Sequence, residues 1–344
     1  MRQAPAPLSR DRVLHLIHRM QSSRVAVLGD IMLDRYLIGD TERVSPEAPV
    51  PVVTVAERHA ALGGAANVGA NVVALGAHCL LVGVVGDDVD GAAIRQELAV
   101  ARLEDRFVLT VAGRPTTSKT RIIARGQQIV RIDDEVDTLL EGQDLSRLVA
   151  GAREALADAD ALLLEDYNKG TLSPGVIASV MEVAKRRGIP IVVDPKYRQF
   201  FEYGGATVFK PNRRELESAL GAAVDLQNGN ALPGVLSRLK VDNLLVTLGS
   251  EGMVLVTKDG ALTQIPSIAR QIYDVSGAGD TVTAWLGTAL AAGASIREAA
   301  QLANYAAGVE VGKPGVATVS PDEVLAAHEE RFDQIGKLRR GGLI

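Results

Sequence analysis

The chain has 344 residues, of which 47% are hydrophobic and 23% are charged, and this balance is typical of a globular domain with a substantial core. Its 42 acidic residues outnumber its 37 Lys and Arg, for a net charge of −5, which argues against nucleic-acid binding through a broad basic face. The single cysteine, Cys79, excludes a disulfide framework or a cysteine-rich zinc site, and no apolar run is long enough for a membrane span or a secretory signal.

Short apolar segments rich in β-branched residues alternate with helical patterns along most of the chain. The predicted strands are Arg24–Gly29, Leu80–Val85, Ala161–Glu165, Ile189–Asp194, Ala206–Phe209 and Asn243–Leu248. The predicted helices are Ala65–Leu75, Gly91–Leu98, Leu145–Ala157, Pro174–Arg187, Arg213–Leu220, Gly279–Gly293 and Ile296–Val311. This alternation predicts an α/β fold, with a mostly parallel central sheet flanked by helices on both faces.

Two stretches interrupt the alternation and predict exposed antiparallel strands, Val50–Ala56 and Phe107–Asp133. Within the second stretch, Ser118–Ala124 and Gln127–Ile132 alternate polar and apolar residues on either side of an Arg-Gly turn signal. Such segments do not fit a fully buried parallel sheet. We therefore expect a small second β-sheet, inserted into the α/β body.

No linker or internal repeat divides the chain, so we expect a single domain over residues 1–344. The lid strands are expected to be inserted around residues 36–60 and 107–133. Exposed strand edges must be paired or covered to avoid aggregation. An inserted sheet of this kind could close over a ligand as a lid and keep water away from it.

A glycine-rich segment near the C-terminus carries the strongest chemical signal. Residues 274–281 read Asp-Val-Ser-Gly-Ala-Gly-Asp-Thr and open a predicted helix. The start of a helix presents unpaired N–H groups to an anion, and small residues let a phosphate approach them. Asp280 would lie beside that phosphate and could accept a proton from an attacking hydroxyl. A capping Asp after a glycine turn is the structural alternative, and no Lys follows the glycines as in a P-loop.

This segment resembles the C-terminal signature of the ribokinase-like (PfkB-type) carbohydrate kinases, in which Thr is commoner at the position of Val275. The N-terminal signature of that family is matched by residues 63–67, Gly-Gly-Ala-Ala-Asn, before a predicted helix. The resemblance implies a ribokinase-like fold and ATP-dependent phosphorylation of a sugar. It implies that Asp280 is the general base and that backbone N–H groups of Gly277, Ala278 and Gly279 hold the transferring phosphoryl group.

The same resemblance assigns residues to the sugar. Gly63 and Gly64 would bring the backbone against the sugar, and Asn67 would bind a hydroxyl. Asp30 and Asp34 follow the first predicted strand, at the sheet edge where open parallel sheets bind ligands. A turn residue at the end of a strand is the structural alternative for Asp30.

Two further elements of the family suggest a nucleotide site with Mg²⁺. The Asn-x-x-Glu element is matched by Asn212 and Glu215, which would organise Mg²⁺ through water. The loop under the nucleotide is matched by residues 247–252. The implied nucleotide-binding residues are Asn212, Thr247, Gly249, Gly252 and Asn304. A helix capping box and a plain hairpin turn are the structural alternatives for these two elements.

A narrower resemblance, over Ser22 to Glu329, is to the D-glycero-β-D-manno-heptose 7-phosphate kinases. It rests on residues 29–36, 43–52, 166–170, 194–196 and 303–313. This resemblance implies phosphorylation of the anomeric C1 hydroxyl, which yields the 1,7-bisphosphate in ADP-heptose synthesis for the inner core of lipopolysaccharide. Many of these kinases are fused to an adenylyltransferase domain; because this chain ends at Ile344, it resembles the stand-alone form.

A substrate that already carries a phosphate needs a fixed positive charge in its pocket. Lys196, after a predicted strand, and Arg131, in the predicted lid, are the first choices for this role. The other candidates are Arg43, Lys119, Arg121, Lys169 and Arg198. The expected ligands are therefore a sugar phosphate, ATP and Mg²⁺, with no nucleic acid and no membrane. The family resemblance also implies a homodimer through the lid sheet, and the single cysteine fits the reducing cytoplasm.

Three alternatives stay open on the sequence. The first is another ribokinase-like kinase, acting on a different sugar or sugar phosphate. The second is a non-catalytic sugar sensor on a kinase scaffold, since a fold does not determine function; the presence of Asp280, Asn212 and Glu215 argues against it. The third, a dinucleotide-dependent dehydrogenase, is weakened because the first strand lacks the Gly-x-Gly-x-x-Gly fingerprint.

Overall fold

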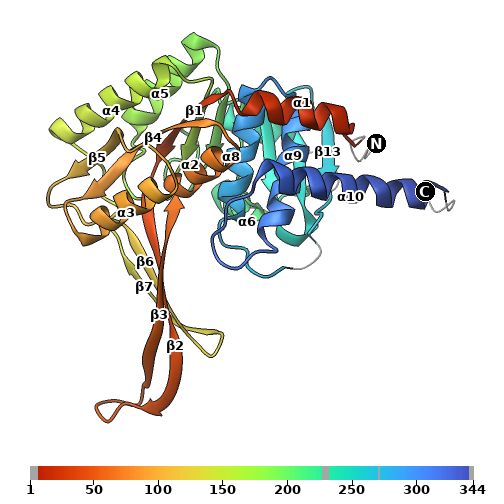
Figure 1. Ribbon diagram of the computed structural model, residues 1–344. Coiled ribbons are helices and arrows are strands. Elements are labelled where there is room, and N and C mark those ends of the chain that lie inside the picture. Colours follow the sequence, from red (N-terminus) through yellow and green to blue (C-terminus); the bar gives the residue numbers. More distant parts are fainter. Residues whose placement is uncertain (1–6, 227–231, 270–271, 341–344) are drawn as a thin grey trace.

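A large sheet runs through the body of the molecule in the order β13-β12-β11-β10-β9-β8-β1-β4-β5 (Figure 1). The computed structural model describes residues 7–226, 232–269 and 272–340. The strands are β1 (Arg24–Gly29), β4 (His78–Gly86), β5 (Phe107–Val111), β8 (Ala161–Glu165), β9 (Ile191–Asp194), β10 (Val208–Phe209), β11 (Asn243–Thr247), β12 (Met253–Val256) and β13 (Leu262–Ile265). Only β12 and β13, at one edge, pair antiparallel with their neighbours. The predicted mostly parallel α/β fold is confirmed.

Helices cover both faces of this sheet because successive strand residues point to opposite sides. In β1, Val25 and Val27 pack into one hydrophobic layer, whereas Ala26 and Leu28 pack into the other. The helices of the first layer are α1 (Arg10–Met20), α2 (Ala65–Ala74), α3 (Val89–Val100), α8 (Ala278–Ala291), α9 (Ile296–Glu310) and α10 (Pro321–Arg340). Those of the second layer are α4 (Gly142–Ala157), α5 (Pro174–Arg187), α6 (Arg213–Leu220) and α7 (Leu232–Leu239).

Helix α8 packs closely against the centre of the sheet. A Cβ atom on Gly287 would overlap the side chain of Leu163 in β8, so only glycine allows this approach. Trp285 is fully buried on the same helix. This close packing carries the first turn of α8 to the carboxyl ends of β8 and β9, where the candidate site lies.

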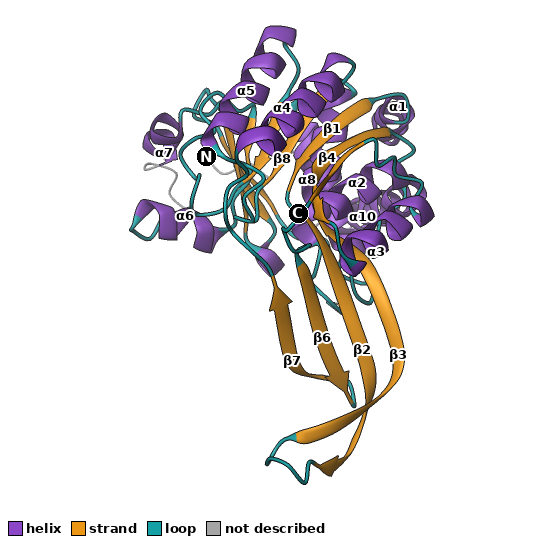
Figure 2. Cartoon of the chain, turned by 90° about the vertical axis from the view of Figure 1, so that its left-hand side faces the viewer, coloured by secondary structure: helices purple, strands orange, loops and turns teal. Residues whose placement is uncertain are grey.

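A second sheet projects from the body as a long arm (Figure 2). Its strands are β2 (Ile31–Val44), β3 (Pro51–Gly64), β6 (Ser118–Ala124) and β7 (Gln127–Asp134), in the order β3-β2-β6-β7. We call this sheet the lid. The predicted inserted sheet therefore exists, and the predicted hairpin around the Arg-Gly turn is its β6–β7 pair.

Two details of the lid prediction are wrong. Phe107–Val111 is not part of the lid, because it pairs parallel with β4 and forms one edge of the main sheet. The segment is short and only partly buried, which is common to the edge of a covered sheet and to an exposed sheet, so the pattern does not separate them. The lid is also not wholly antiparallel, since β2 and β6 run parallel.

Several elements lie outside the prediction, namely α1, α3 before Gly91, α7, α10, β12 and β13. The lid strands also extend beyond the predicted segment of residues 36–60, since β2 begins at Ile31 and β3 ends at Gly64. No helix among the described residues is both long and apolar enough to cross a membrane. The single domain over residues 1–344 stays a prediction, because both ends of the chain lie outside the described residues.

Candidate active site

The first turn of α8 holds the predicted base. Asp280 is buried, with only 4% of its surface exposed. Its Oδ2 accepts a hydrogen bond of 2.7 Å from Asn67 Nδ2, and its Oδ1 accepts one of 2.8 Å from the hydroxyl of Tyr167. The structure thus joins Asp280 and Asn67, from the two signature segments. Tyr167 was not predicted as a site residue, although it lies in one of the segments that carry the narrower resemblance.

The surroundings of Asp280 suit a proton acceptor. The pKa of this carboxyl is raised to about 6. Burial is the largest cause and the nearby Asp194 adds to it, whereas the hydrogen bonds from Asn67 and Tyr167 act in the opposite direction. A carboxylate with a pKa close to neutral is ionised under ordinary conditions and still takes up a proton readily. The geometry therefore fits a general base with two fixed hydrogen-bond donors.

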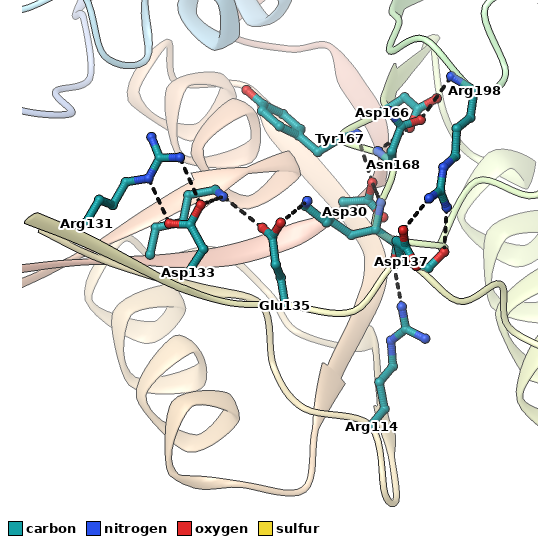
Figure 3. Close-up of polar contacts among 12 residues, drawn as sticks. Asp30, Arg114, Arg131, Asp133, Glu135, Asp137, Asp166, Tyr167, Asn168 and Arg198 are labelled. Atoms are coloured by element: carbon teal, nitrogen blue, oxygen red, sulfur yellow. Dashed lines mark hydrogen bonds and ion pairs between the residues drawn. The ribbon is translucent and has the colours of Figure 1, made fainter.

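Asp30 anchors the loop that follows β8. Its Oδ2 accepts hydrogen bonds from the backbone N–H groups of Tyr167 (2.8 Å; Figure 3) and Lys169 (2.9 Å). Its Oδ1 accepts one from the N–H group of Thr171 (3.1 Å). Asp30 is almost fully buried. The carboxylate predicted to hold the sugar thus also shapes the loop that delivers Tyr167 to the base.

The glycine pair lets β3 end against this region. Gly64 has a φ of +57°, and a Cβ atom on it would overlap the carbonyl oxygen of Asp30. A Cβ atom on Gly63 would lie 2.6 Å from Oδ2 of Asp34, which is ion-paired with Arg121 of the lid. The predicted sugar-binding residues Asp30, Asp34, Gly63 and Gly64 therefore meet where the lid joins the body.

A cavity of about 260 Å³ lies beside the start of α8. All five residues predicted for the nucleotide line it: Asn212, Thr247, Gly249, Gly252 and Asn304. Ala278 and Gly279 line it as well, which connects the cavity with the turn that carries Asp280. The residues at 247–252 join β11 to β12, so the hairpin turn and the cavity wall are the same segment.

Asn212 and Glu215 form a capping box at the start of α6. The Asn212 side chain accepts from the Glu215 N–H, and Glu215 Oε2 accepts from the Asn212 N–H, each at 2.9 Å. The other oxygen of Glu215 is ion-paired with Lys196, whose ammonium lies 5.0 Å from the centre of the Tyr167 ring. Lys196 is therefore on the side of the nucleotide cavity, while Arg131 of the lid pairs with Asp133.

An acidic group was missed by the sequence analysis. Carboxylate oxygens of Glu165, Asp194 and Asp280 lie within 4.8 Å of one another, and Lys210 Nζ is 2.7 Å from Asp194. Both oxygens of the fully buried Glu165 lack a hydrogen-bond partner in the part of the chain that the structure describes. Burial, then Asp194 and Asp280, raise the pKa of Glu165 well above its usual range. Carboxylates without hydrogen-bond partners fit a hard cation such as Mg²⁺. The sequence signal that could have identified this group is that Glu165 and Asp194 each end a parallel strand.

A second buried carboxylate lies under the glycine turn. Neither oxygen of Glu310 has a hydrogen-bond partner among the described residues, and a Cβ atom on Gly277 would be 3.4 Å from its Oε1. Burial, followed by the charges of Asp274 and Asp280, raises the pKa of Glu310 to about 8, against the attraction of Lys313.

Glu310→Gln should therefore stabilise the protein at alkaline pH. The folded chain holds a proton on Glu310 between the ordinary pKa of 4.5 and about 8, so the free energy of unfolding falls as the pH rises through this range. Gln keeps the shape and cannot ionise. We expect the variant to exceed the wild type by about 1 kcal/mol or more near pH 8, and to differ little near pH 5. Urea unfolding at both pH values measures this; an equal difference at the two would contradict it.

The architecture of this chain is shared with solved structures of ribokinases. Ribokinase of Arabidopsis thaliana, solved with ribose and ATP, superposes with a TM-score of 0.72 over 90% of this chain and 99% of its own, at 22% sequence identity. That similarity establishes the fold. With the glycine turn, the buried carboxylate and the adjoining cavity, the class of protein is an ATP-dependent carbohydrate kinase, which uses ATP with Mg²⁺.

The particular family follows from the sequence match. The chain belongs to the pfkB family of carbohydrate kinases, whose model matches residues 22–323. It is 45% identical to the bifunctional protein HldE of Rhodospirillum rubrum over 89% of this chain and 62% of that protein. It is 43% identical to HldE of Trichlorobacter lovleyi over 93% of this chain and 66% of that protein. The chain thus spans about two thirds of the length of these relatives.

Proposed function

We propose that the protein transfers the terminal phosphoryl group of ATP to the C1 hydroxyl of D-glycero-β-D-manno-heptose 7-phosphate. The observation that carries this proposal is the loop of residues 166–170, one of the segments of the narrower resemblance. Asp30 binds this loop through two of its N–H groups, and the loop places the Tyr167 hydroxyl on Asp280. Residues particular to the heptose kinases are thus built into the environment of the base. The similarity to HldE proteins supports the same substrate.

In the proposed mechanism, Asp280 accepts the proton of the C1 hydroxyl as that oxygen attacks the phosphoryl group. Asn67 and Tyr167 hold the carboxylate in place by their hydrogen bonds. Backbone N–H groups of Gly277, Ala278 and Gly279 stabilise the charge of the transferring group. The sugar hydroxyls are held at the junction of lid and body by Asp30, Asp34, Gly63, Gly64 and Asn67.

ATP is proposed to occupy the cavity lined by Asn212, Thr247, Gly249, Gly252 and Asn304. Bound Mg²⁺ supplies neutralisation of the phosphate charges. Glu165 and Asp194 fit direct contact with the ion because both oxygens of Glu165 lack a hydrogen-bond partner among the described residues. Asn212 and Glu215 fit contact through water, since their carbonyl and carboxylate groups are already engaged in the capping box.

A panel of substrates tests the function. With ATP and Mg²⁺, the purified protein should phosphorylate heptose 7-phosphate far more efficiently than fructose 1-phosphate, fructose 6-phosphate or ribose, as measured by ADP release and by identification of the 1,7-bisphosphate. Equal or better turnover of another sugar would assign the protein to a different substrate of the same family. ATP turnover with none of these sugars would favour the sensor alternative.

We also propose a cytoplasmic homodimer joined through the lids. The outer strands β3 and β7 leave their edges open, and β7 exposes Ile129, Val130 and Ile132 to solvent. An exposed apolar strand at a sheet edge is a ready surface for pairing with another chain. Light scattering of the wild type gives the mass in solution, and a monomer at working concentrations would contradict this part of the proposal.

The lid should become more protected when the sugar phosphate binds. Strand β7 is exposed along its whole length and β6 is half-buried between β2 and β7, and both project from the body as part of the lid, so their amides should exchange faster in the free protein than those of the buried main sheet. Hydrogen exchange with mass spectrometry should show slower exchange over residues 118–134 at saturating heptose 7-phosphate. Peptides from the buried strand β8 serve as the internal control. Identical exchange of the lid with and without substrate would contradict closure.

A further inference from the structure

One carboxylate at the junction of lid and body is shared by two lysines. Glu135, directly after β7, lies 2.9 Å from Lys119 Nζ through Oε2 and 2.7 Å from Lys169 Nζ through Oε1 (Figure 3). Lys119 belongs to lid strand β6, and Lys169 belongs to the loop after β8. Both lysine side chains are only 16% exposed. The carboxylate of Glu135 therefore holds together two part-buried ammonium groups, one from the lid and one from the loop after β8.

The loop after β8 connects this pair to the base. The N–H groups of Tyr167 and Lys169 donate to the same oxygen of Asp30. The Tyr167 side chain reaches Asp280, whereas the Lys169 side chain reaches Glu135. Lys119 is the register partner of Asp34 in β2. Lys119 and Lys169 are thus connected to Asp34 and Asp30, the residues proposed to hold the sugar. If one end of the sugar lies at Asp280, the two lysines are placed to meet its other end.

The local charges favour an anion. Lys119 also lies 3.3 Å from Asp133, which is bound by Arg131 through two nitrogens. In this group three cations, Lys119, Lys169 and Arg131, pair with two carboxylates, Glu135 and Asp133. The other candidate cations have their own partners: Arg121 pairs with Asp34, Arg198 pairs with Asp137 and Lys196 pairs with Glu215. Lys119 and Lys169 converge on Glu135 from the lid and from the loop after β8, whereas Lys119 and Arg131, which share Asp133, both belong to the lid.

We propose that Lys119 and Lys169 bind the phosphate group of the sugar phosphate, and that Glu135 occupies their ammonium groups until this phosphate displaces it. The inference rests on the proposed function and identifies the phosphate subsite of the same site. A phosphate monoester carries up to two negative charges and three acceptor oxygens, against one charge and two oxygens for Glu135. The exchange therefore gains charge complementarity while both lysines keep a partner. Lysine suits this role because its ammonium is a compact charge that can follow a moving anion.

The test compares variants with opposite expected effects. Lys119→Ala and Lys169→Ala should each raise the KM for heptose 7-phosphate by about 10- to 150-fold, and leave the KM for ATP and the turnover of the unphosphorylated heptose unchanged. Glu135→Gln removes the competing charge and should lower the KM for heptose 7-phosphate. Loss of a merely structural contact would raise the KM in all three variants. In Lys169→Ala, the Glu135 carboxylate keeps only Lys119 as a partner. The double variant Lys169→Ala with Glu135→Gln controls for the effect of this partly paired carboxylate.

Arg125→Ala, which removes a lid cation paired with Asp40, is the matched control and should behave as the wild type. Urea unfolding of each variant confirms that it is folded, and Lys119→Gln and Lys169→Gln replace any Ala variant that is not. If the wild type prefers the phosphorylated heptose and both lysine variants keep that preference, the subsite is overturned while the proposed function stands. If the wild type itself shows no preference for the phosphorylated heptose, the proposed function fails and the subsite fails with it.

Discussion

Asp280→Asn should lower kcat by about 10²- to 10⁴-fold, the usual loss when a general base is removed. Asn keeps the size of the side chain and one acceptor oxygen, so the contact from either Asn67 or Tyr167 can persist. The KM values for ATP and sugar should change little, because the variant removes proton acceptance without altering the cavity. Single-turnover phosphorylation measures the chemical step directly.

The dependence of this reaction on pH provides the control. The pKa of Asp280 is raised to about 6, and only the ionised form accepts a proton, so wild-type kcat/KM should rise with pH through about 6 and then level off. The residual activity of Asp280→Asn should lack that rise. Turnover of the Asn variant close to the wild-type value would remove Asp280 from the role of base.

Lys210→Met should lower the free energy of unfolding by about 3–5 kcal/mol, the cost of leaving a buried charge without its partner. Lys210 Nζ lies 2.7 Å from Asp194, and only 3% of its side chain is exposed. Glu165 and Asp280 lie beside the same carboxylate. Methionine retains the length of the chain and removes the only ammonium that contacts this group among the described residues. Urea unfolding near neutral pH measures the loss.

A double-mutant cycle separates the charge effect from packing. Asp194→Asn in the Lys210→Met background removes the stranded carboxylate and should recover part of the lost stability. Lys185→Met is the matched control, since Lys185 is exposed and contacts only the carbonyl oxygen of Gly204; it should change stability by less than about 0.5 kcal/mol. Equal destabilisation by Lys185→Met and Lys210→Met would show that the buried ion pair contributes little.

Local patterns were sufficient for much of the body of the fold. The run from Val25 to Leu28 is apolar at consecutive positions, as expected of a strand covered on both faces, and it forms the interior strand β1, between β8 and β4. The glycine turn before Asp280 was readable because a helix start with a φ of +91° at Gly277 needs glycine. The five residues expected around a nucleotide do line one cavity. Asn212 precedes the start of α6, and Thr247, Gly249 and Gly252 lie at the end of β11 or in the turn after it, whereas Asn304 comes from the middle of α9.

Long-range pairing could not be read in the same way. A short β-rich segment such as Phe107–Val111 could belong to the lid or to the edge of the main sheet, and only its register with β4 assigns it. The group of Glu165, Asp194 and Asp280 comes from three segments that are far apart in the sequence, so no local spacing of residues predicts it.

The amino-acid sequence by itself determined the α/β order, the glycine turn and the candidate for the base, Asp280, because these depend on backbone conformation and short-range periodicity. The tertiary structure alone decided which charges meet. Lys196 pairs with Glu215 beside the nucleotide cavity, whereas Lys119 and Lys169 share Glu135 under the lid. The sequence around a lysine does not specify which carboxylate it will contact. That partner depends on how the main sheet, the loop after β8 and the lid pack together.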